Sequence, residues 1–244
     1  MENKEIKDGM RLYINITNHC NLECPFCCMY SSPKNFNSNM NFETFKHIID
    51  THKSYNNLEV QIEGGEPTTN QMISLGFFLF VTYVLEQENV SKVIILSNGT
   101  FSKDTFKHLV NLSNVYKKRI EMKISINYWI IKEKFNNDIT KAMKFYDRLI
   151  FLTKYLPYFS IKFNTRLRLN DQDKDIEDGI KRFNLDQYTD LFNFQSYGRL
   201  MDSIDYKKPV IKQNIKDWKI YSHDGICFFQ DLIVRSEYEG GKIK

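Results

Sequence analysis

The sequence predicts an α/β protein with a parallel sheet, and three observations support this fold class. Short runs rich in branched apolar residues alternate about six times with segments of helical periodicity. Polar or glycine-rich turns separate these segments. The chain has 244 residues, 42% of them hydrophobic and 26% charged, which is enough for one sizeable core. Such alternation places helices outside a parallel sheet, which either curves into a partial (β/α)6 barrel or forms a doubly wound sheet.

The expected strands are short, and the first one shows the clearest pattern. Residues 11–17 alternate polar and apolar side chains, with β-branched residues among them. Five further apolar runs have the length of strands, at 58–62, 92–96, 120–126, 158–169 and 191–195. Because ligands bind at the carboxyl ends of the strands in such sheets, the loops after the first three strands are expected to share one rim.

The helices between these strands follow from apolar spacing and capping residues. Apolar residues recur at helical spacing from Phe42 to Ile49, and Asn41 is a suitable N-cap. Residues 73–85 form the most apolar stretch, which is too short to span a bilayer and indicates one buried helix. Three more helices are expected at 102–112, 139–156 and 173–183.

Composition and charge argue against several classes of function. The net charge is +4, and the basic residues are spread along the chain without the dense run typical of nucleic-acid binders. Residues 1–7 are charged and lack the apolar segment of a signal peptide. We therefore expect a cytoplasmic protein that binds neither nucleic acid nor membrane and whose five cysteines are reduced.

Three of these cysteines form a metal-binding pattern in the loop after the first strand. Cys20, Cys24 and Cys27 have the spacing C-x3-C-x2-C. Three close thiolates hold three irons of a cubane cluster and leave the fourth iron without a protein ligand. A zinc site with His19 or Cys28 as the fourth ligand explains the same residues, so the spacing alone leaves both metals open.

Further motifs resolve this choice, because the loop resembles the signature of the radical S-adenosylmethionine (SAM) superfamily. In that signature an aromatic residue precedes the third cysteine, as Phe26 does here. Residues 64–67, Gly-Gly-Glu-Pro, resemble the family's GGEP motif after the second strand, and residues 97–99, Ser-Asn-Gly, resemble its element after the third. The resemblance covers roughly residues 11–200. It implies a partial (β/α)6 TIM-like barrel, one 4Fe-4S cluster on the three cysteines, and SAM as the second cofactor.

The resemblance also implies where SAM binds. In the family, the backbone at the position of Phe26 contacts the adenine, the GGEP segment binds the methionine amino group, and polar residues after the fourth strand meet the ribose or carboxylate. The cofactor-binding residues expected here are therefore Phe26, Gly64, Gly65, Glu66, Ser97, Asn98, Ser125 and Asn127. Ser125 and Asn127 are equally compatible with ordinary polar groups at the end of a strand.

Arg166 joins this list on a physical argument. The two-residue period of the fifth strand places Asn164, Arg166 and Arg168 on one face. An arginine that points into a barrel is costly unless it meets an anion, such as the carboxylate of SAM or of the substrate. The alternative is an edge strand whose polar face lies in water.

Cys227 is separated from the other cysteines by almost the whole chain. One interpretation is a buried, inert thiol. Some radical SAM peptide epimerases carry a single late cysteine that returns a hydrogen atom to the substrate, which makes Cys227 a candidate catalytic residue. Because no cysteine follows it, we expect residues 1–200 to form the core domain and residues 201–244 an irregular extension or lid, without a complete auxiliary cluster domain.

The leading functional prediction is a radical SAM enzyme that modifies a ribosomally made peptide by epimerisation or cross-linking. The segment at residues 27–33 resembles the corresponding loop of peptide-modifying relatives. One alternative is a radical SAM enzyme for a small molecule, such as a nucleotide, sugar or amino acid. The other is a non-catalytic zinc or iron–sulfur module. For an enzyme, the resemblance implies a flavodoxin- or ferredoxin-type electron donor.

Overall fold

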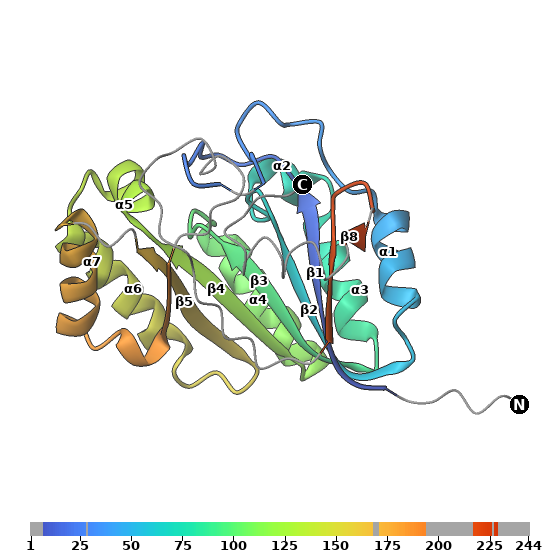
Figure 1. Ribbon diagram of the computed structural model, residues 1–244. Helices are drawn as coiled ribbons and strands as arrows, with labels where there is room; N and C mark the ends of the chain where they lie inside the picture. Colours follow the sequence, from blue (N-terminus) through green and yellow to red (C-terminus); the bar gives the residue numbers. More distant parts are fainter. Residues whose placement is uncertain (1–6, 28, 168–170, 194–216, 226, 229–244) are drawn as a thin grey trace, which may run out of the picture.

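A single curved sheet of eight strands organises the computed structural model, which describes residues 7–27, 29–167, 171–193, 217–225 and 227–228 (Figure 1). The strands are β1 (Lys7–Thr17), β2 (Tyr55–Gly64), β3 (Val90–Ser97), β4 (Arg119–Ile126), β5 (Phe159–Leu167), β6 (Thr189–Asn193), β7 (Asp217–Tyr221) and β8 (Cys227–Phe228). Their order in the sheet is β6-β5-β4-β3-β2-β1-β7-β8. Neighbouring strands from β6 to β7 are parallel, and β8 is antiparallel to β7.

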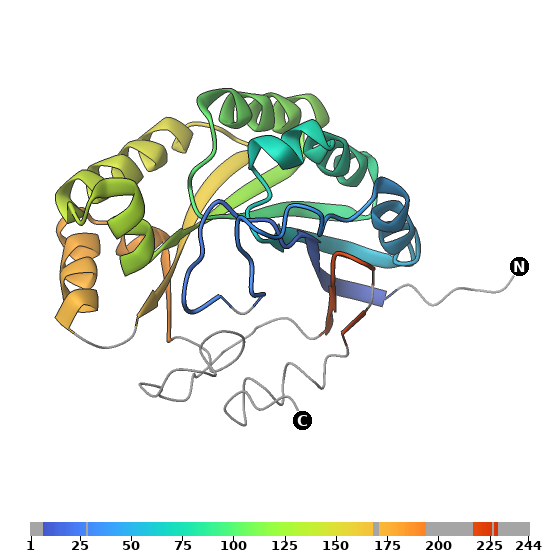
Figure 2. The ribbon, with the colours of Figure 1, turned by 90° about the horizontal axis from the view of Figure 1, so that it is seen from above.

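Helices cover the convex face of this sheet and leave its concave face to other groups (Figure 2). The helices are α1 (Phe42–Asp50), α2 (Asn70–Ser74), α3 (Phe77–Glu86), α4 (Lys103–Tyr116), α5 (Tyr128–Phe135), α6 (Ile139–Thr153) and α7 (Asp171–Arg182), with a 3-10 turn, η1 (Asp186–Tyr188), before β6. Among the described strands, β6 and β8 are the two edges, so the sheet is an open arc. This confirms the predicted α/β class and the partial barrel.

The strand pleat separates an apolar outer face from a polar inner face. On β1, Leu12, Ile14 and Ile16 are fully buried in the core beneath the helices. The alternate residues of β1, including Arg11 and Asn15, lie on the concave side. Apolar burial therefore stabilises the layer between the sheet and the helices, and the concave side carries the polar groups.

The six predicted strands correspond to β1–β6, and the predicted N-cap of α1 is present. The Asn41 side chain accepts a hydrogen bond from the backbone N–H of Thr44 at 2.8 Å. The single helix predicted over residues 73–85 is wrong. The chain instead forms α2 and α3, because Gly76 adopts a left-handed conformation with φ 98° between them. In a continuous helix every residue has negative φ, so this glycine ends the first helical segment.

Two features of the fold were not expected from the sequence. Helix α5 follows β4 directly and begins after Asn127, whose side chain caps it. The tail contributes β7 and β8 to the same sheet, with β7 pairing in parallel with β1 from Met10 to Ile14. In the part of the chain that the structure describes, every helix is too short or too polar to cross a bilayer.

Candidate functional site

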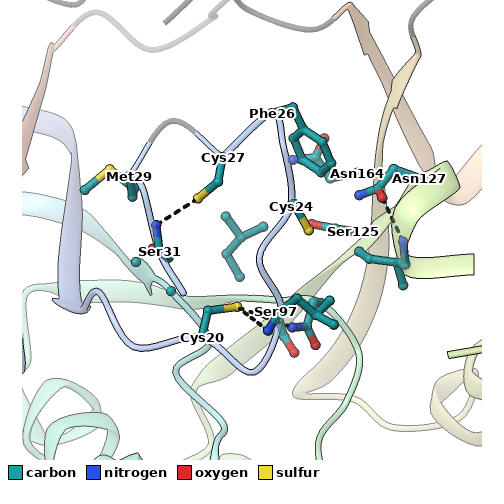
Figure 3. A pocket seen from close by; sticks show the side chains of 16 residues that line it. Cys20, Cys24, Phe26, Cys27, Met29, Ser31, Ser97, Ser125, Asn127 and Asn164 are labelled. Carbon is teal, nitrogen blue, oxygen red and sulfur yellow. Dashed lines mark hydrogen bonds between the residues drawn. The ribbon is translucent and has the colours of Figure 1, made fainter. Parts of the chain in front are cut away.

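The three clustered cysteines and the carboxyl ends of β2–β5 line one cavity of about 170 Å³ (Figure 3). Segments that are far apart in the sequence meet here, because the loops after parallel strands emerge at the same edge of the sheet. The lining residues used below are Cys20, Cys24, Phe26, Cys27, Gly64, Gly65, Leu96, Ser97, Asn98, Ser125, Asn127 and Asn164. All of the predicted cofactor-binding positions except Glu66 and Arg166 are among them.

The cysteine loop leaves β1 and is tied back to it at both ends. Met40 donates its backbone N–H to the Ile16 carbonyl at 2.8 Å, and the Thr17 hydroxyl donates to Asn39 Oδ1 at 2.6 Å. Within the loop, the backbone N–H of Cys20 donates to the carbonyl of Ser32 at 3.2 Å. These hydrogen bonds hold the two ends of the loop, which has more than 20 residues, close together. The loop therefore keeps its cysteines over the end of the sheet.

The sulfurs of Cys20 and Cys27 accept backbone hydrogen bonds. The N–H of Leu22 lies 3.4 Å from the sulfur of Cys20, and the N–H of Ser31 lies 3.4 Å from that of Cys27. Such N–H groups stabilise negative charge on sulfur. Burial raises the pKa of the Cys20 thiol to about 12, so metal binding at this position must release a proton.

The sulfur donors fit a cluster whose irons are shared among the three cysteines. Within the described residues, no three His, Cys, Asp or Glu side chains form the ligand set of a single ion. Cys20, Cys24 and Cys27 instead surround a common cavity, as the ligands of a cubane do. Of the two alternative fourth ligands for zinc, His19 does not line the cavity, and Cys28 lies outside the described residues.

Gly64 and Gly65 line the cavity and also pack directly against the cysteine loop. A Cβ atom on Gly65 would lie 2.0 Å from the carbonyl oxygen of His19, and one on Gly64 would lie 2.2 Å from that of Thr17. The backbone N–H of Gly65 donates to the Thr17 carbonyl at 2.6 Å. The glycines are therefore required for contact between two backbones, in addition to the close approach of a ligand.

Glu66 does not line the cavity, and its predicted role in SAM binding stays a prediction. Its side chain is fully buried, and burial raises the pKa of its carboxyl group. The carboxylate accepts hydrogen bonds from the N–H of Thr68 at 3.1 Å, the hydroxyl of Ser97 at 2.9 Å and the N–H of Asn98 at 2.6 Å, as well as from the Thr68 hydroxyl. Glu66 thus joins the turn after β2 to the turn after β3.

Asn98 extends this connection to the cysteine loop. Its side-chain amide donates to Asn21 Oδ1 at 2.9 Å and lies 3.8 Å from the sulfur of Cys20. On the other side of the same turn, the Lys134 ammonium donates to the carbonyl of Gly99 and lies 3.9 Å from the centre of the Phe145 ring. Burial lowers the pKa of Lys134 to about 8. No sequence motif marks Lys134, because it lies 35 positions after Gly99 in the chain.

The ends of β4 and β5 supply polar groups with unused hydrogen-bonding capacity. Ser125 and Asn164 are register partners, and both line the cavity. Asn164 Oδ1 is buried and has no hydrogen-bond partner among the described residues. A buried acceptor of this kind is costly unless a ligand supplies a donor. Asn164 was not among the predicted binding residues, although the two-residue period of β5 places it on the same face as Arg166.

Other predicted residues have mixed outcomes. Asn127 lines the cavity, and its Oδ1 also accepts the N–H of Ile130 at 3.0 Å, which caps α5. Phe26 packs against Trp129 of α5, with 5.1 Å between the ring centroids. Arg166 lies in β5 opposite Phe192, and Cys227 lies in β8 opposite Tyr221. The side chains of Arg166 and Cys227 lie outside the described set, so their roles stay predictions.

Comparison with known proteins identifies the family of this chain. Residues 8–143, more than half of the chain, match the family of the 4Fe-4S single cluster domain. The chain is 30% identical over 116 residues to the antilisterial bacteriocin subtilosin biosynthesis protein AlbA of Bacillus subtilis (strain 168), covering 46% of this chain and 23% of that protein. It is 22% identical over 185 residues to GTP 3′,8-cyclase of Aquifex aeolicus (strain VF5), covering 62% of this chain and 57% of that one.

The fold is similar to that of a solved structure, Streptococcus suis SuiB bound to precursor peptide SuiA. The TM-score is 0.53 at 16% identity, and the match covers 83% of this chain and 43% of that chain. The chain spans about a quarter and somewhat more than half of the two curated relatives, and less than half of the solved one.

Proposed function

Because the chain belongs to the 4Fe-4S single cluster domain family and to the radical SAM superfamily, we propose that it is an enzyme that cleaves SAM reductively and abstracts a hydrogen atom from its substrate. The observation that carries this proposal is the shared cavity. Three thiols from one loop and the polar ends of β2–β5 line the same space. A cluster ligand set and a binding surface for a polar cofactor are therefore adjacent.

Cys20, Cys24 and Cys27 are the residues that would hold the cluster. The proposed SAM-binding residues are those of the motifs, Phe26, Gly64, Gly65, Glu66, Ser97, Asn98, Ser125 and Asn127, and the cavity lining adds Asn164. Arg166 is proposed for a carboxylate in the same region. When bound, the two cofactors supply a 5′-deoxyadenosyl radical that removes a hydrogen atom from an unactivated carbon. The chain's own contribution is to orient the groups: the glycine turn allows close approach, and Asn164 presents an acceptor that has no hydrogen-bond partner among the described residues.

Anaerobic reconstitution with iron and sulfide tests this proposal. We expect a brown protein with the absorption and EPR spectra of a 4Fe-4S cluster, and 5′-deoxyadenosine after addition of SAM and dithionite. The triple variant with alanine at positions 20, 24 and 27 should lose the cluster and all SAM cleavage, since each thiolate is one of three ligands. Cys227→Ala is the matched control and should keep the cluster. A full cluster spectrum in the triple variant would contradict the assignment.

For the substrate, we propose a ribosomally made peptide that is epimerised or cross-linked. The support is the relative from Bacillus subtilis, which is named for the biosynthesis of a bacteriocin. The cyclase from Aquifex aeolicus, named for GTP, favours a nucleotide as the second candidate class. Co-expression with candidate precursor peptides, followed by mass spectrometry and chiral amino-acid analysis, separates the two classes. A product found only with nucleotides would overturn the peptide assignment.

If the reaction is an epimerisation, we propose Cys227 as the hydrogen-atom donor. The thiol S–H bond breaks and a C–H bond forms on the peptide radical, which leaves a thiyl radical that the external electron donor and a proton return to the thiol. In deuterated water, Cys227→Ala should continue to form 5′-deoxyadenosine but should lose the epimerised product and its deuterium. Unchanged, fully deuterated product would exclude this role.

The remaining parts of the proposal concern electron supply and location. We propose a flavodoxin- or ferredoxin-type protein as the electron donor, and a cytoplasmic location in which the three cluster cysteines stay reduced. Replacement of dithionite by a reduced flavodoxin or ferredoxin tests the donor. Formation of 5′-deoxyadenosine with dithionite but with neither protein would contradict it.

A further inference from the structure

The inner face of the sheet continues below the cofactor cavity, and β4 carries a lysine there. Lys123 precedes the cavity residue Ser125 by two positions, so it points to the same face one layer deeper. The strand register places Leu96, which also lines the cavity, on one side of Lys123 and Lys162 on the other. Lys123 is therefore a partly buried cation directly beside the cavity wall.

The other cations of this face whose side chains the structure describes have carboxylate partners. Arg11 Nε donates to Glu59 Oε2 at 2.8 Å, and Lys92 lies 3.0 Å from the other oxygen of Glu59. Lys162 lies 3.8 Å from Glu121. Lys123, in contrast, has no hydrogen bond or ion pair with any of the residues that the structure describes. Among the described residues of this face, Lys123 is therefore the lysine without a carboxylate partner.

The surroundings of Lys123 increase the cost of this unmatched charge. Lys123 and Lys162 are directly opposite on neighbouring strands, an arrangement in which like charges repel. Burial lowers the pKa of Lys123, and the nearby cations Arg11 and Lys162 lower it further, while Glu121 and Asp190 act in the opposite direction. Asp190 is exposed and pairs in register with Asn164 one layer above.

Glu121 does not neutralise the pair of lysines. Its side chain is only 3% exposed, and its Oε2, the atom 3.8 Å from Lys162, lacks a hydrogen bond within the described structure. An interaction of that length is weak, and the side chain of Lys162 is 46% exposed. Two cations therefore share one distant carboxylate, and an additional anion would satisfy Lys123.

We propose that Lys123, with Lys162 beside it, binds the carboxylate of an acidic side chain in the substrate. The site lies on the inner face directly below the SAM-binding rim, so it would anchor a peptide residue close to the position of hydrogen abstraction. This inference rests on the proposed peptide substrate. It adds that the peptide carries an Asp or Glu near the modified residue.

Binding of short capped peptides to the reconstituted enzyme tests the site. The probes are Ac-Ala-Ala-Glu-Ala-Ala-NH2, its Gln counterpart, and the Gln peptide with a free C-terminal carboxylate. We expect the Glu peptide to bind about tenfold more tightly than the amidated Gln peptide, and Lys123→Met to abolish this preference. Lys123→Arg should retain it. Lys92→Met, which removes a paired lysine from the same face, is the charge-matched control and should also retain it.

The outcomes separate this inference from the proposed function. Formation of 5′-deoxyadenosine without peptide should be the same in wild type and Lys123→Met; absence of it in both would contradict the proposed function and leave the binding measurement valid. An unchanged Glu preference in Lys123→Met overturns the carboxylate site, as does absence of any preference in the wild type. Tighter binding of the free C-terminal carboxylate than of the Glu side chain overturns the side-chain assignment. Circular dichroism of each variant verifies its folding, and Lys123→Arg gives an independent result if Lys123→Met does not fold.

Discussion

The two halves of the cavity differ in how their polar groups are used. On the β1–β3 side, Glu66, Ser97 and Asn98 bond to one another, and Asn98 reaches the cysteine loop. On the β4–β5 side, Asn164 Oδ1 has no hydrogen-bond partner among the described residues, and neither does the Lys123 ammonium below the cavity. The turns after β2 and β3 are joined by their own contacts and form the satisfied half, although Asn18 Oδ1 in the cysteine loop is also buried without a hydrogen-bond partner among the described residues. The ends of β4 and β5 form the open half, where Asn164 keeps an acceptor for a ligand.

The largest effect should come from Gly65→Ala, which introduces a clash into the satisfied half. The new Cβ would lie 2.0 Å from the carbonyl oxygen of His19, a backbone atom that cannot move without the cysteine loop. We expect loss of both cluster and SAM binding, measured by iron content and by equilibrium dialysis. Gly9→Ala is the control for backbone strain alone, since Gly9 also has a positive φ, 74°, but an added Cβ there would meet no atom within 4 Å. A variant with full cluster and no SAM binding would show that Gly65 serves the ligand alone.

Glu66→Gln should have the next largest effect, because one amide oxygen cannot replace two carboxylate oxygens. Oε1 accepts from the N–H of Thr68 and Oε2 accepts from the N–H of Asn98, so the new NH2 group must face a backbone donor. We expect a decrease of about 2 kcal/mol in the free energy of unfolding and weaker retention of the cluster. Urea denaturation measures the first and iron content the second. Ser97→Ala removes one donor to Glu66 and the acceptor of the Gly99 N–H, and it should still cost less because both backbone donors of Glu66 keep their partners. An equal cost would argue against Glu66 as the residue that joins the two turns.

Asn164→Leu should affect the open half and leave the other half intact. The substitution removes an acceptor that has no partner in the described protein, so the free energy of unfolding should stay the same or increase. SAM affinity should fall about tenfold if a donor of SAM pairs with this oxygen. The cluster spectrum should not change. Unaltered SAM affinity would place the partner of Asn164 elsewhere, and loss of the cluster would contradict the division into two halves.

The smallest effect concerns Lys134, which supports the turn after β3. Burial lowers its pKa from 10.5 to about 8, so between these pH values the unfolded chain binds more protons than the folded chain. The free energy of unfolding of the wild type should therefore rise, relative to Lys134→Met, by about 1 kcal/mol between pH 8 and pH 9. Urea denaturation at several pH values measures this difference. Lys132→Met, an exposed lysine of the same helix, should show no such trend. Parallel curves for wild type and Lys134→Met would contradict the buried position.

The parts of the site that the sequence determined are local. C-x3-C-x2-C places three thiols within one loop, and the turns at residues 64–67 and 97–99 follow strands that the apolar pattern identifies. The open fold class follows from the same alternation of strands and helices. The single helix predicted over residues 73–85 was wrong, because Gly76 divides an apolar stretch whose composition alone favours one helix.

Other properties of the site depend on which residues become neighbours across the sheet. Only the tertiary structure determines those neighbours. Glu66 does not line the cavity, and three of its donors come from positions 68, 97 and 98. Asn164 and Lys123 acquire their roles from the register of β4 and β5, and Lys134 acquires its role from a contact between α5 and the turn after β3. Spacing along a chain specifies which groups can act together locally, but burial and pairing between distant strands determine which polar groups are satisfied and which remain for a ligand.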